Sequence, residues 1–355
     1  MKAGLLLAVD EFVVEDVVQL PPGPRDAIVR IGASGVCHSD LSVMDGSAGL
    51  PTPVLLGHEG VGIVEWVGDE VTRVKVGDRV VASLTSVCNA CWHCTRGETH
   101  LCEATFAAMM QPRVLHGDEP VPALAGLGTF AESMTSSELS LVPVVSDLPD
   151  EQLALLGCGV TTGLGAVLNT GRPEPGATVL VIGLGGVGTA ALQGAKIAGA
   201  SMLIAADPVS DKRAAAIGFG ATHAIDPGEG PIADQVRALT GGRGVDLAVE
   251  AVGKGPLVEQ ALAATRRGGT TVLVGAAASD VQVSFSPMSL VVDDRTIKGC
   301  FYGRAQVQRD LPRFIRLAET GRLDLSSMVS RTIPLAEVGD ALRGMGGREI
   351  RTVVV

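Results

Sequence analysis

The sequence has few aromatic residues: phenylalanine, tyrosine and tryptophan make up 3% of its 355 residues, against 46 glycines. That balance favours tight turns and close packing of helices on sheets over an aromatic-rich all-β shell. The chain also lacks an excess of positive charge, because its formal net charge is −11. An acidic chain is repelled by nucleic acid and by anionic membranes, so we expect neither as a partner.

The sequence lacks an uninterrupted hydrophobic run long enough to cross a membrane, which needs about 20 largely apolar residues. The most apolar stretch, residues 178–206, is broken by six glycines between Gly183 and Gly199. It is therefore interpreted as a buried strand, turn, helix and strand. No export signal is evident after Lys2, and the seven cysteines then indicate a reducing compartment. We expect a soluble, cytoplasmic protein.

Length and pattern predict two domains. Up to about residue 145 the chain shows short alternating runs between glycines and prolines, which predicts an antiparallel, barrel-like β domain. From residue 178 strands and helices alternate, which predicts a parallel, doubly wound α/β sheet. The segment from about residue 302 is too short to fold alone and is expected to pack on the first domain. The predicted strands of the parallel sheet are 178–182, 202–206, one around 224, 245–249 and 271–274.

A glycine-rich turn joins the first predicted strand of the parallel sheet to a helix. Gly183, Gly185 and Gly188 follow the pattern Gly-x-Gly-x-x-Gly, and Asp207 ends the next strand 19 residues after Gly188. Strand, turn, helix and acid in this register indicate a dinucleotide site, with the pyrophosphate at the helix N-terminus. Asp207 would bond the adenosine ribose and repel a 2′-phosphate, which predicts NAD rather than NADP. The alternative is a turn that binds no ligand.

Two groups of residues have the chemistry of zinc ligands. Cys37, His58 and Cys158 offer two thiolates and one imidazole, which leaves one position of a zinc tetrahedron open for water or substrate. Cys158 alone would be interpreted as a small buried hydrophobe, and only its pairing with the other two favours a ligand.

The second group can close a zinc tetrahedron with no position left for substrate, which predicts a structural site. Its members share one short stretch, residues 88–102, and are Cys88, Cys91, Cys94 and Cys102. The alternative is a cluster of free thiols. His93 and His100 lie between these cysteines, are superfluous as ligands and are expected at the surface.

These motifs together resemble a known family. The run Gly57-His-Glu-x-x-Gly62 followed by Gly68, with both cysteine groups and the glycine-rich turn, is similar to the zinc-dependent medium-chain dehydrogenase/reductase family, alcohol dehydrogenase type. The resemblance covers nearly the whole chain. It implies a GroES-like β-barrel catalytic domain (1–158 and 302–355), a Rossmann NAD-binding domain (159–301), one catalytic and one structural Zn²⁺ per chain, and a homodimer or homotetramer.

The resemblance also implies roles for single residues. Ser39 matches the hydroxyl that takes the alcohol proton, Asp40 the carboxylate that orients the ligating histidine, and Glu59 the acid beside the metal. Positions that match cofactor contacts are His38, Thr162, Gly186, Val187, Lys212, Val274 and Arg351. For Lys212 and Arg351 the alternative is a solvated surface charge, and for His38 the alternative is a residue that merely fills space. Ser42 stands where many relatives place a relay histidine, so the last step of proton export stays open.

The activity implied by the resemblance is hydride transfer between a primary alcohol and NAD, with aldehyde reduction as the reverse path. Ala48 and Leu84 match pocket positions, and their modest bulk predicts that aryl or medium-chain alcohols fit better than ethanol. One alternative is a thiol-dependent formaldehyde dehydrogenase, which a basic cluster at the pocket mouth would favour. Another is a non-catalytic protein on the same scaffold, which a missing zinc ligand would favour. The sequence shows neither feature.

Overall fold

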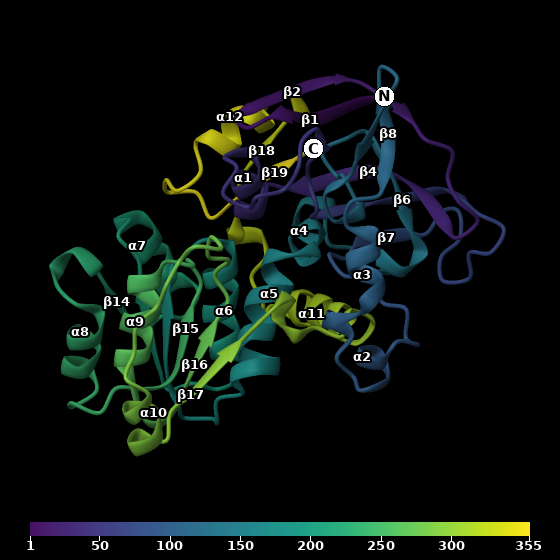
Figure 1. The fold of residues 1–355 in the computed structure, drawn as a ribbon. Coiled ribbons are helices and arrows are strands. Elements are labelled where there is room, and N and C mark those ends of the chain that lie inside the picture. Colours follow the sequence, from purple (N-terminus) through teal and green to yellow (C-terminus); the bar gives the residue numbers. More distant parts are fainter.

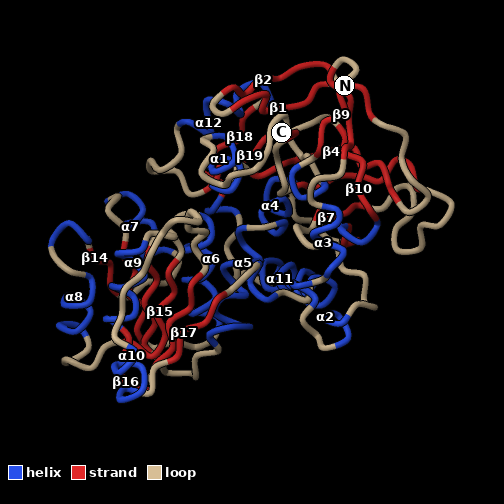
Figure 2. Tube along the Cα trace, viewed as in Figure 1, coloured by secondary structure: helices blue, strands red, loops and turns tan.

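The computed structural model describes residues 1–355 and divides into two lobes. Figure 1 shows one lobe formed by the first part of the chain together with its C-terminal end, and a second lobe formed by the residues between them. Figure 2 shows strands in both lobes, with helices flanking the sheet of the second one. The predicted mixed α/β architecture is confirmed.

Short, mostly antiparallel strands build the first lobe. Its largest sheet has the order β11-β7-β6-β4-β19-β18, with β10 also paired to β4. These strands are β4 (Asp26–Gly35), β6 (Gly60–Val67), β7 (Arg79–Ala82), β10 (Ser133–Ser137), β11 (Leu141–Pro143), β18 (Val329–Ile333) and β19 (Arg351–Val354). The last two come from the end of the chain, so the C-terminal segment packs on the first lobe as predicted.

Two three-stranded sheets and several short helices complete this lobe. The first sheet contains β1 (Lys2–Ala8), β2 (Glu11–Asp16) and β5 (Val54–Leu55), and the second β3 (Val18–Gln19), β8 (Pro112–His116) and β9 (Glu119–Pro122). The short helices, which the sequence pattern did not predict, are α1 (His38–Met44), α2 (Trp92–Thr95), α3 (Glu103–Ala108) and α12 (Val338–Arg343). Helices this short carry too little periodicity to stand out in a sequence.

A six-stranded parallel sheet forms the second lobe, in the order β14-β13-β12-β15-β16-β17. Its strands are β12 (Thr178–Ile182), β13 (Met202–Ala206), β14 (His223–Ile225), β15 (Val245–Glu250), β16 (Thr265–Leu273) and β17 (Thr296–Gly299). In chain order this is 3-2-1-4-5-6, the arrangement that places a dinucleotide where the order reverses. The sequence pattern missed β17, because four residues that include Lys298 and Gly299 form no apolar run.

Helices cover both faces of this sheet. Val179 and Val181 of β12 pack with α6 (Gly186–Ile197) and α7 (Ser210–Gly218), whereas Leu180 and Ile182 pack with α8 (Ile232–Leu239) and α9 (Gly255–Ala264). Alternate residues of a strand point to opposite faces, so a strand with no polar position is buried on both. The sheet is therefore doubly wound, as predicted.

The segment between the lobes bends at Cys158. It consists of α4 (Asp150–Ala154), a 3₁₀ turn (Leu155–Gly157), α5 (Gly159–Gly165) and a wider final turn (Ala166–Gly171). No single helix of the chain is long and apolar enough to cross a membrane. The bent pair Asp150–Gly157 and Gly159–Gly171 passes such a test by length and composition alone, and residues 153–167 are all buried inside the protein.

Candidate active site

Four side chains from three separate segments converge between the lobes. Cys37 caps the N-terminus of α1, His58 and Glu59 immediately precede β6, and Cys158 lies at the bend before α5. Their ligand atoms all lie within 4.8 Å of one another, and all four side chains are buried. The structure therefore brings the three predicted ligands together with the predicted acid.

Asp40 holds two of these segments in place. Its Oδ1 accepts the backbone N–H of Gly57 (2.9 Å) and lies 3.2 Å from His58 Nδ1. Its Oδ2 accepts the backbone N–H of Cys37 (3.2 Å). The contact between Asp40 and His58 Nδ1 leaves His58 Nε2 as the ring nitrogen available to the site. Nε2 is buried without any hydrogen-bond partner. Buried polar atoms normally have a partner, so an orphaned nitrogen beside two thiols fits a metal-binding set.

The electrostatics of the cluster favour a bound cation. Burial lowers the pKa of His58, but the Asp40 carboxylate and the Cys37 thiolate outweigh it and raise the pKa to about 10. A hydrogen bond from Cys158 lowers the pKa of Cys37 well below its ordinary value, against the effect of burial and with help from the positive charge of His58. A site that stabilises both a thiolate and a positive charge suits a divalent metal.

Glu59 connects the cluster to the glycine-rich turn. Its Oε1 accepts the backbone N–H of Gly159 (3.0 Å), and its other oxygen forms a buried ion pair with Arg351. The Arg351 side chain lies against Gly186, where an added Cβ would come within 2.4 Å of Arg351 Cδ. Arg351 and Lys212 are only 4% and 9% exposed, so the alternative of solvated surface charges is wrong for both.

The glycine-rich turn has the geometry of a phosphate cradle. Gly183 has a positive φ of 88°, and a Cβ at Gly188 would lie 1.7 Å from the Gly183 carbonyl oxygen, so helix α6 starts against the end of β12. Asp207 follows β13, where its carboxylate accepts the N–H groups of Leu184 (2.8 Å) and Val209 (2.9 Å). The acid thus holds the turn, and its contact with a ribose stays a prediction.

The remaining predicted residues lie around these two features. Thr162 is buried one turn after Cys158, whose carbonyl accepts its N–H (2.8 Å). Ser39 is exposed, with its Oγ 3.8 Å from Cys37 Sγ. Others, for which the structure gives position rather than contact with the cluster, are His38 (exposed on α1), Gly185 (N-cap of α6), Val187 (half-buried on α6), Lys212 (α7), Val274 (after β16), Ala48 (exposed) and Leu84 (half-buried). Their roles stay predictions.

Two residues near the site were missed by sequence reasoning. Arg213 donates from Nη1 to the carbonyl of Asp207 (2.7 Å) and pairs through Nη2 with Asp226 (2.8 Å). Tyr302 is buried and donates from its hydroxyl to the carbonyl of Gly157 (2.6 Å), directly before Cys158. The one sequence signal for Tyr302 is that the chain has a single tyrosine.

The second cysteine group also forms a compact cluster. The sulfur atoms of Cys88, Cys91, Cys94 and Cys102 lie within 4.8 Å of one another. Two of the sulfur pairs are separated by 4.0 and 3.9 Å. In a tetrahedral site with Zn–S bonds of about 2.3 Å the sulfurs lie about 3.8 Å apart, so the spacing fits a closed zinc site. Backbone N–H groups of Glu103 and Cys94 lower the pKa of Cys91 to about 6, which favours the thiolate.

His100 departs from expectation. It is only 5% exposed, because the turn Thr99–Leu101 packs against the segment after residue 301, where Thr99 Oγ1 donates to the Ala305 carbonyl (3.1 Å). Burial lowers the pKa of His100. The prediction of a surface histidine is therefore wrong at this position, whereas His93 is half-buried and lies 3.2 Å from a Glu98 oxygen.

Two family models match the chain. Residues 23–147 match the alcohol dehydrogenase GroES-like domain, and residues 186–320 match the zinc-binding dehydrogenase domain. Together they span well over half of the chain. The chain belongs to the zinc-dependent medium-chain dehydrogenase/reductase family. Zinc alcohol dehydrogenases of this family are oxidoreductases, and the two cysteine-containing clusters provide donor sets that fit zinc.

Individual members of the family are similar over nearly their whole length. A Mycobacterium tuberculosis protein provisionally named alcohol dehydrogenase D is 39% identical over 94% of this chain and 93% of its own. An Escherichia coli S-(hydroxymethyl)glutathione dehydrogenase is 37% identical over 97% of this chain and 95% of its own.

Solved structures of the family superpose on the chain. The benzyl alcohol dehydrogenase of Acinetobacter calcoaceticus has a TM-score of 0.92 at 29% identity, covering 99% of this chain and 98% of its own. A Sinorhizobium meliloti protein provisionally described as a zinc-binding dehydrogenase, bound to NADP, has a TM-score of 0.84 at 26% identity, covering 100% of this chain and 98% of its own.

Proposed function

We propose that the protein is an NAD-dependent zinc alcohol dehydrogenase that interconverts a primary alcohol and its aldehyde. One observation carries the proposal: the three-ligand set of Cys37, His58 and Cys158 is joined to the glycine-rich turn through the Glu59–Arg351 ion pair. A three-ligand zinc site is open to substrate, and the set lies beside a glycine-rich turn of the kind that binds dinucleotides, which supports the proposal.

In this proposal zinc supplies Lewis-acid polarisation of the alcohol oxygen when bound, and NAD supplies the hydride acceptor. Asp40 fixes the His58 ring so that Nε2 faces the two sulfurs. Ser39 takes the alcohol proton, and because its side chain is exposed, the hydroxyl can pass that proton to water. Ser42, half-buried on the same helix, replaces the usual relay histidine, so proton export runs through Ser39 and solvent.

The cofactor preference rests on Asp207 and Arg213. The buried Asp207 carboxylate would accept hydrogen bonds from ribose hydroxyls and repel a 2′-phosphate. Arg213, the cation in contact with Asp207, is already paired with Asp226 and is not free to bind that phosphate. We expect kcat/KM to be higher with NAD than with NADP. In Asp207→Ser the ratio of kcat/KM with NAD to kcat/KM with NADP should decrease. A wild-type preference for NADP would overturn this assignment.

Aryl or medium-chain primary alcohols are the proposed substrates. The predicted pocket residues Ala48 and Leu84 are small or of modest bulk, and a benzyl alcohol dehydrogenase is similar in structure over nearly the whole chain. Steady-state kinetics over an alcohol series tests this. A higher kcat/KM for ethanol than for benzyl alcohol would exclude the proposed specificity.

A second candidate is oxidation of the S-hydroxymethyl adduct of formaldehyde and a thiol. The 37% identity to a relative named S-(hydroxymethyl)glutathione dehydrogenase favours it. The two substrates differ in charge, because glutathione adds two carboxylates that need basic partners at the pocket mouth. Formaldehyde with glutathione, measured beside benzyl alcohol at equal NAD, decides between them: the better substrate has the higher kcat/KM.

Metal analysis combined with NAD reduction tests the core of the proposal. Cys37→Ala should lose one of two zinc equivalents together with alcohol oxidation. Cys300→Ala is the matched control, because Cys300 is buried but belongs to neither cluster. Full activity in Cys37→Ala, or equal zinc content in both variants, would contradict a catalytic zinc at this site.

We further propose a homodimer or homotetramer. Strand β17 is the edge of the parallel sheet, and the neighbouring helix α10 (Pro287–Asp293) has no buried residue. It exposes Met288, Val291 and Val292, and an apolar helix beside a free strand edge is a self-complementary surface. Analytical ultracentrifugation of the wild type should give a dimer or tetramer, and Val291→Glu should weaken it. A monomer at micromolar concentration would exclude the proposal.

A further inference from the structure

Helix α11 (Val307–Glu319) has one apolar and one basic face. Leu311, Phe314 and Ile315 are buried in the core. Arg309, Arg313 and Arg316 are exposed, and their spacing of four and three residues places them along one face of the helix. The chain as a whole carries a net charge of −11, so this face opposes the overall balance.

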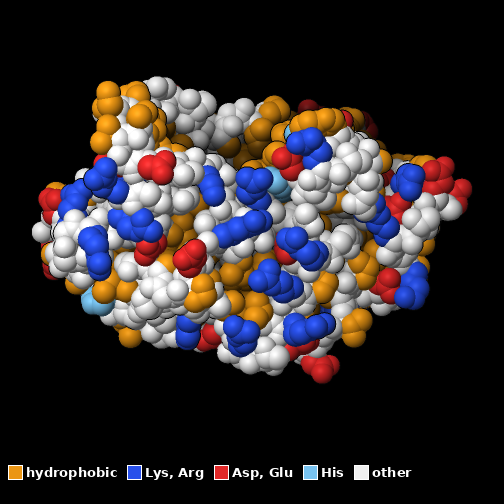
Figure 3. Space-filling view, turned by 90° about the horizontal axis from the view of Figure 1, so that it is seen from below, with side chains coloured by type: hydrophobic (Ala, Val, Ile, Leu, Met, Phe, Trp, Pro, Cys, Tyr) orange, Lys and Arg blue, Asp and Glu red, His pale blue; other side chains and the backbone are white.

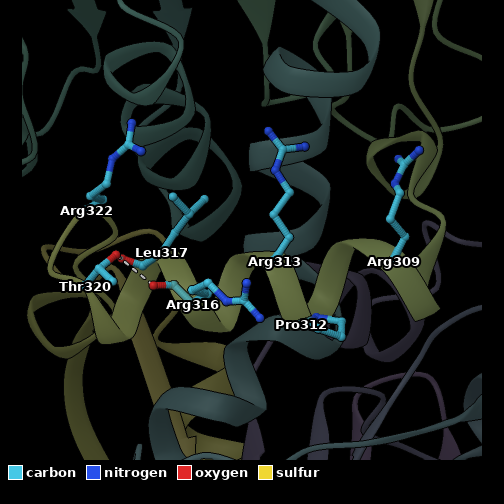
Figure 4. A pocket seen from close by; sticks show the side chains of 7 residues that line it. All are labelled: Arg309, Pro312, Arg313, Arg316, Leu317, Thr320 and Arg322. Atoms are coloured by element: carbon cyan, nitrogen blue, oxygen red, sulfur yellow. Dashed lines mark hydrogen bonds between the residues drawn. The ribbon is translucent and has the colours of Figure 1, made fainter.

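The basic face and the turn that follows α11 line a groove of about 540 Å³. The groove is lined by Arg309, Pro312, Arg313, Arg316, Leu317, Thr320 and Arg322. Figure 4 shows Arg309, Arg313 and Arg322 extending to the same side of the helix, with Arg316 lying along it toward Pro312. Four guanidinium groups and no carboxylate therefore share one hollow.

Most of this positive charge has no counter-charge. Arg309 pairs with the buried Asp310 (2.8 Å), but Arg313, Arg316 and Arg322 take part in no ion pair. By contrast, the arginine-lined hollow in the second lobe includes Asp293, which pairs with Arg267 and Arg295 there. Figure 3 shows many basic side chains on the face seen from below, with fewer acidic ones among them. Unpaired cations held together in a groove repel one another, and an anion relieves that repulsion.

We propose that this groove, defined here as the α11 groove, binds a small polyphosphate anion. The three guanidinium groups without an ion pair, on Arg313, Arg316 and Arg322, each present a planar fork that bonds two oxygens of a phosphoryl group, whereas the fork of Arg309 is bonded to Asp310. Arginine suits this recognition better than lysine. The rise of about 1.5 Å per residue sets Arg309, Arg313 and Arg316 about 6 and 4.5 Å apart along the axis, within reach of successive phosphoryl groups of one ligand. The volume lies in the range of about 300–1,000 Å³ typical of small-molecule sites.

The lining also indicates which part of the ligand is recognised. Leu317 and Pro312 are the apolar side chains of the groove, and no aromatic ring is available to stack a nucleobase. The α11 groove therefore recognises the phosphate chain itself, whether free or part of a nucleotide. None of its residues belongs to the zinc clusters or the glycine-rich turn, so this site is separate from the proposed cofactor site.

Calorimetric titration of the full-length, zinc-loaded protein with inorganic tripolyphosphate tests the proposal. We expect saturable binding at one site per chain in low salt, weakened by added sodium chloride because exposed charges are screened. The triple variant Arg313→Gln, Arg316→Gln, Arg322→Gln should bind at least about tenfold more weakly, since it removes three charge-assisted contacts. All three side chains are exposed and their mutual repulsion is removed, so the thermal midpoint should not fall.

Two control variants show whether binding depends on the arginines of the groove. Arg30→Gln removes one exposed arginine elsewhere, paired with Glu65, and should bind tripolyphosphate as the wild type does. The triple lysine variant at the same three positions keeps the charge but loses the forks, and should bind with intermediate affinity.

ATP and a glutamate oligopeptide serve as further ligands. ATP should bind in the α11 groove with an affinity close to that of tripolyphosphate if the phosphate chain is what the groove recognises, and saturating NAD should not displace tripolyphosphate. Unchanged binding in the triple glutamine variant, displacement by NAD, absence of saturable binding, or preference for the glutamate oligopeptide would each overturn the proposal. No alcohol oxidation is measured, so these outcomes are independent of the proposed function.

Discussion

Replacing Arg351 by methionine tests the connection between the metal cluster and the glycine-rich turn. The Glu59 side chain is 0% exposed, and after the change its charge keeps only the N–H of Gly159 within the protein. Removing one partner of a buried ion pair destabilises a protein by about 3–5 kcal/mol, because the other charge stays buried and unpaired. We therefore expect Arg351→Met to lower the free energy of unfolding by about that amount in zinc-free protein.

Neutralising the partner should restore most of the loss. In the double variant Glu59→Gln, Arg351→Met no buried charge of the pair remains, so its unfolding free energy should lie within about 1–2 kcal/mol of the wild type. Bound zinc is neutralised by its two thiolate ligands, so the loss in Arg351→Met should be of similar size in zinc-free and zinc-loaded protein. Recovery of stability in the double variant distinguishes an electrostatic effect from simple loss of packing.

Urea unfolding gives the free energies to be compared. It is measured with and without zinc on the wild type, Arg351→Met, the double variant Glu59→Gln, Arg351→Met, and a control. Arg331→Met is the control, because Arg331 pairs with Glu349 at a site where both side chains are well exposed, and such pairs contribute about 0–1 kcal/mol. The cost of leaving the Glu59 charge buried and unpaired would be refuted if Arg351→Met behaved like Arg331→Met, or if the double variant were no more stable than Arg351→Met.

Single contacts give three further predictions. Burial raises the pKa of Glu138, but hydrogen bonds hold it below the ordinary 4.5; their donors are Thr72, Arg73 and Arg25. The lowered pKa stabilises the fold above pH 4.5, and that stability is lost as pH falls through the folded pKa. Glu138→Gln should therefore lower the free energy of unfolding by about 2 kcal/mol at pH 7. In urea unfolding, the difference in free energy between this variant and the wild type should shrink below pH 4.5. Tyr302→Phe removes the hydrogen bond to Gly157 beside Cys158, so a chelator should strip catalytic zinc faster while the four-cysteine zinc stays at the wild-type rate; equal rates at both sites would refute this. Gly188→Ala places a Cβ 1.7 Å from the Gly183 oxygen, so NADH fluorescence titration should show at least about tenfold weaker binding with both zinc equivalents retained. Unchanged affinity would contradict the cradle geometry.

Much of the fold could be predicted from local patterns in the sequence. Strands β12 and β13 match their predicted bounds residue for residue, because a run of apolar residues buried on both faces ends at glycine or aspartate. The four-cysteine cluster was equally readable, since all its members lie within one short stretch. Short helices such as α1, and the edge strand β17, carry too few residues for their periodicity to be read.

Long-range packing decided what the sequence left open. The alternative of a surface charge for Arg351 is wrong because Arg351 is buried against Glu59, far away in the sequence. The predicted surface position of His100 is wrong because the segment after residue 301 covers it. Tyr302 and Arg213 could not be assigned in advance for the same reason, since their contacts depend on how the segments pack.

The sequence by itself thus determined the alternation of strands and helices, the glycine-rich turn and the ligand types, because these depend on residues close together in the chain. Only the tertiary structure brought Cys37, His58 and Cys158 within reach of one another and linked them to the turn through Glu59 and Arg351. It also left Arg313, Arg316 and Arg322 without counter-charges. The physical reason is that burial and pairing of charged groups are properties of packed segments, and no single segment encodes its neighbours.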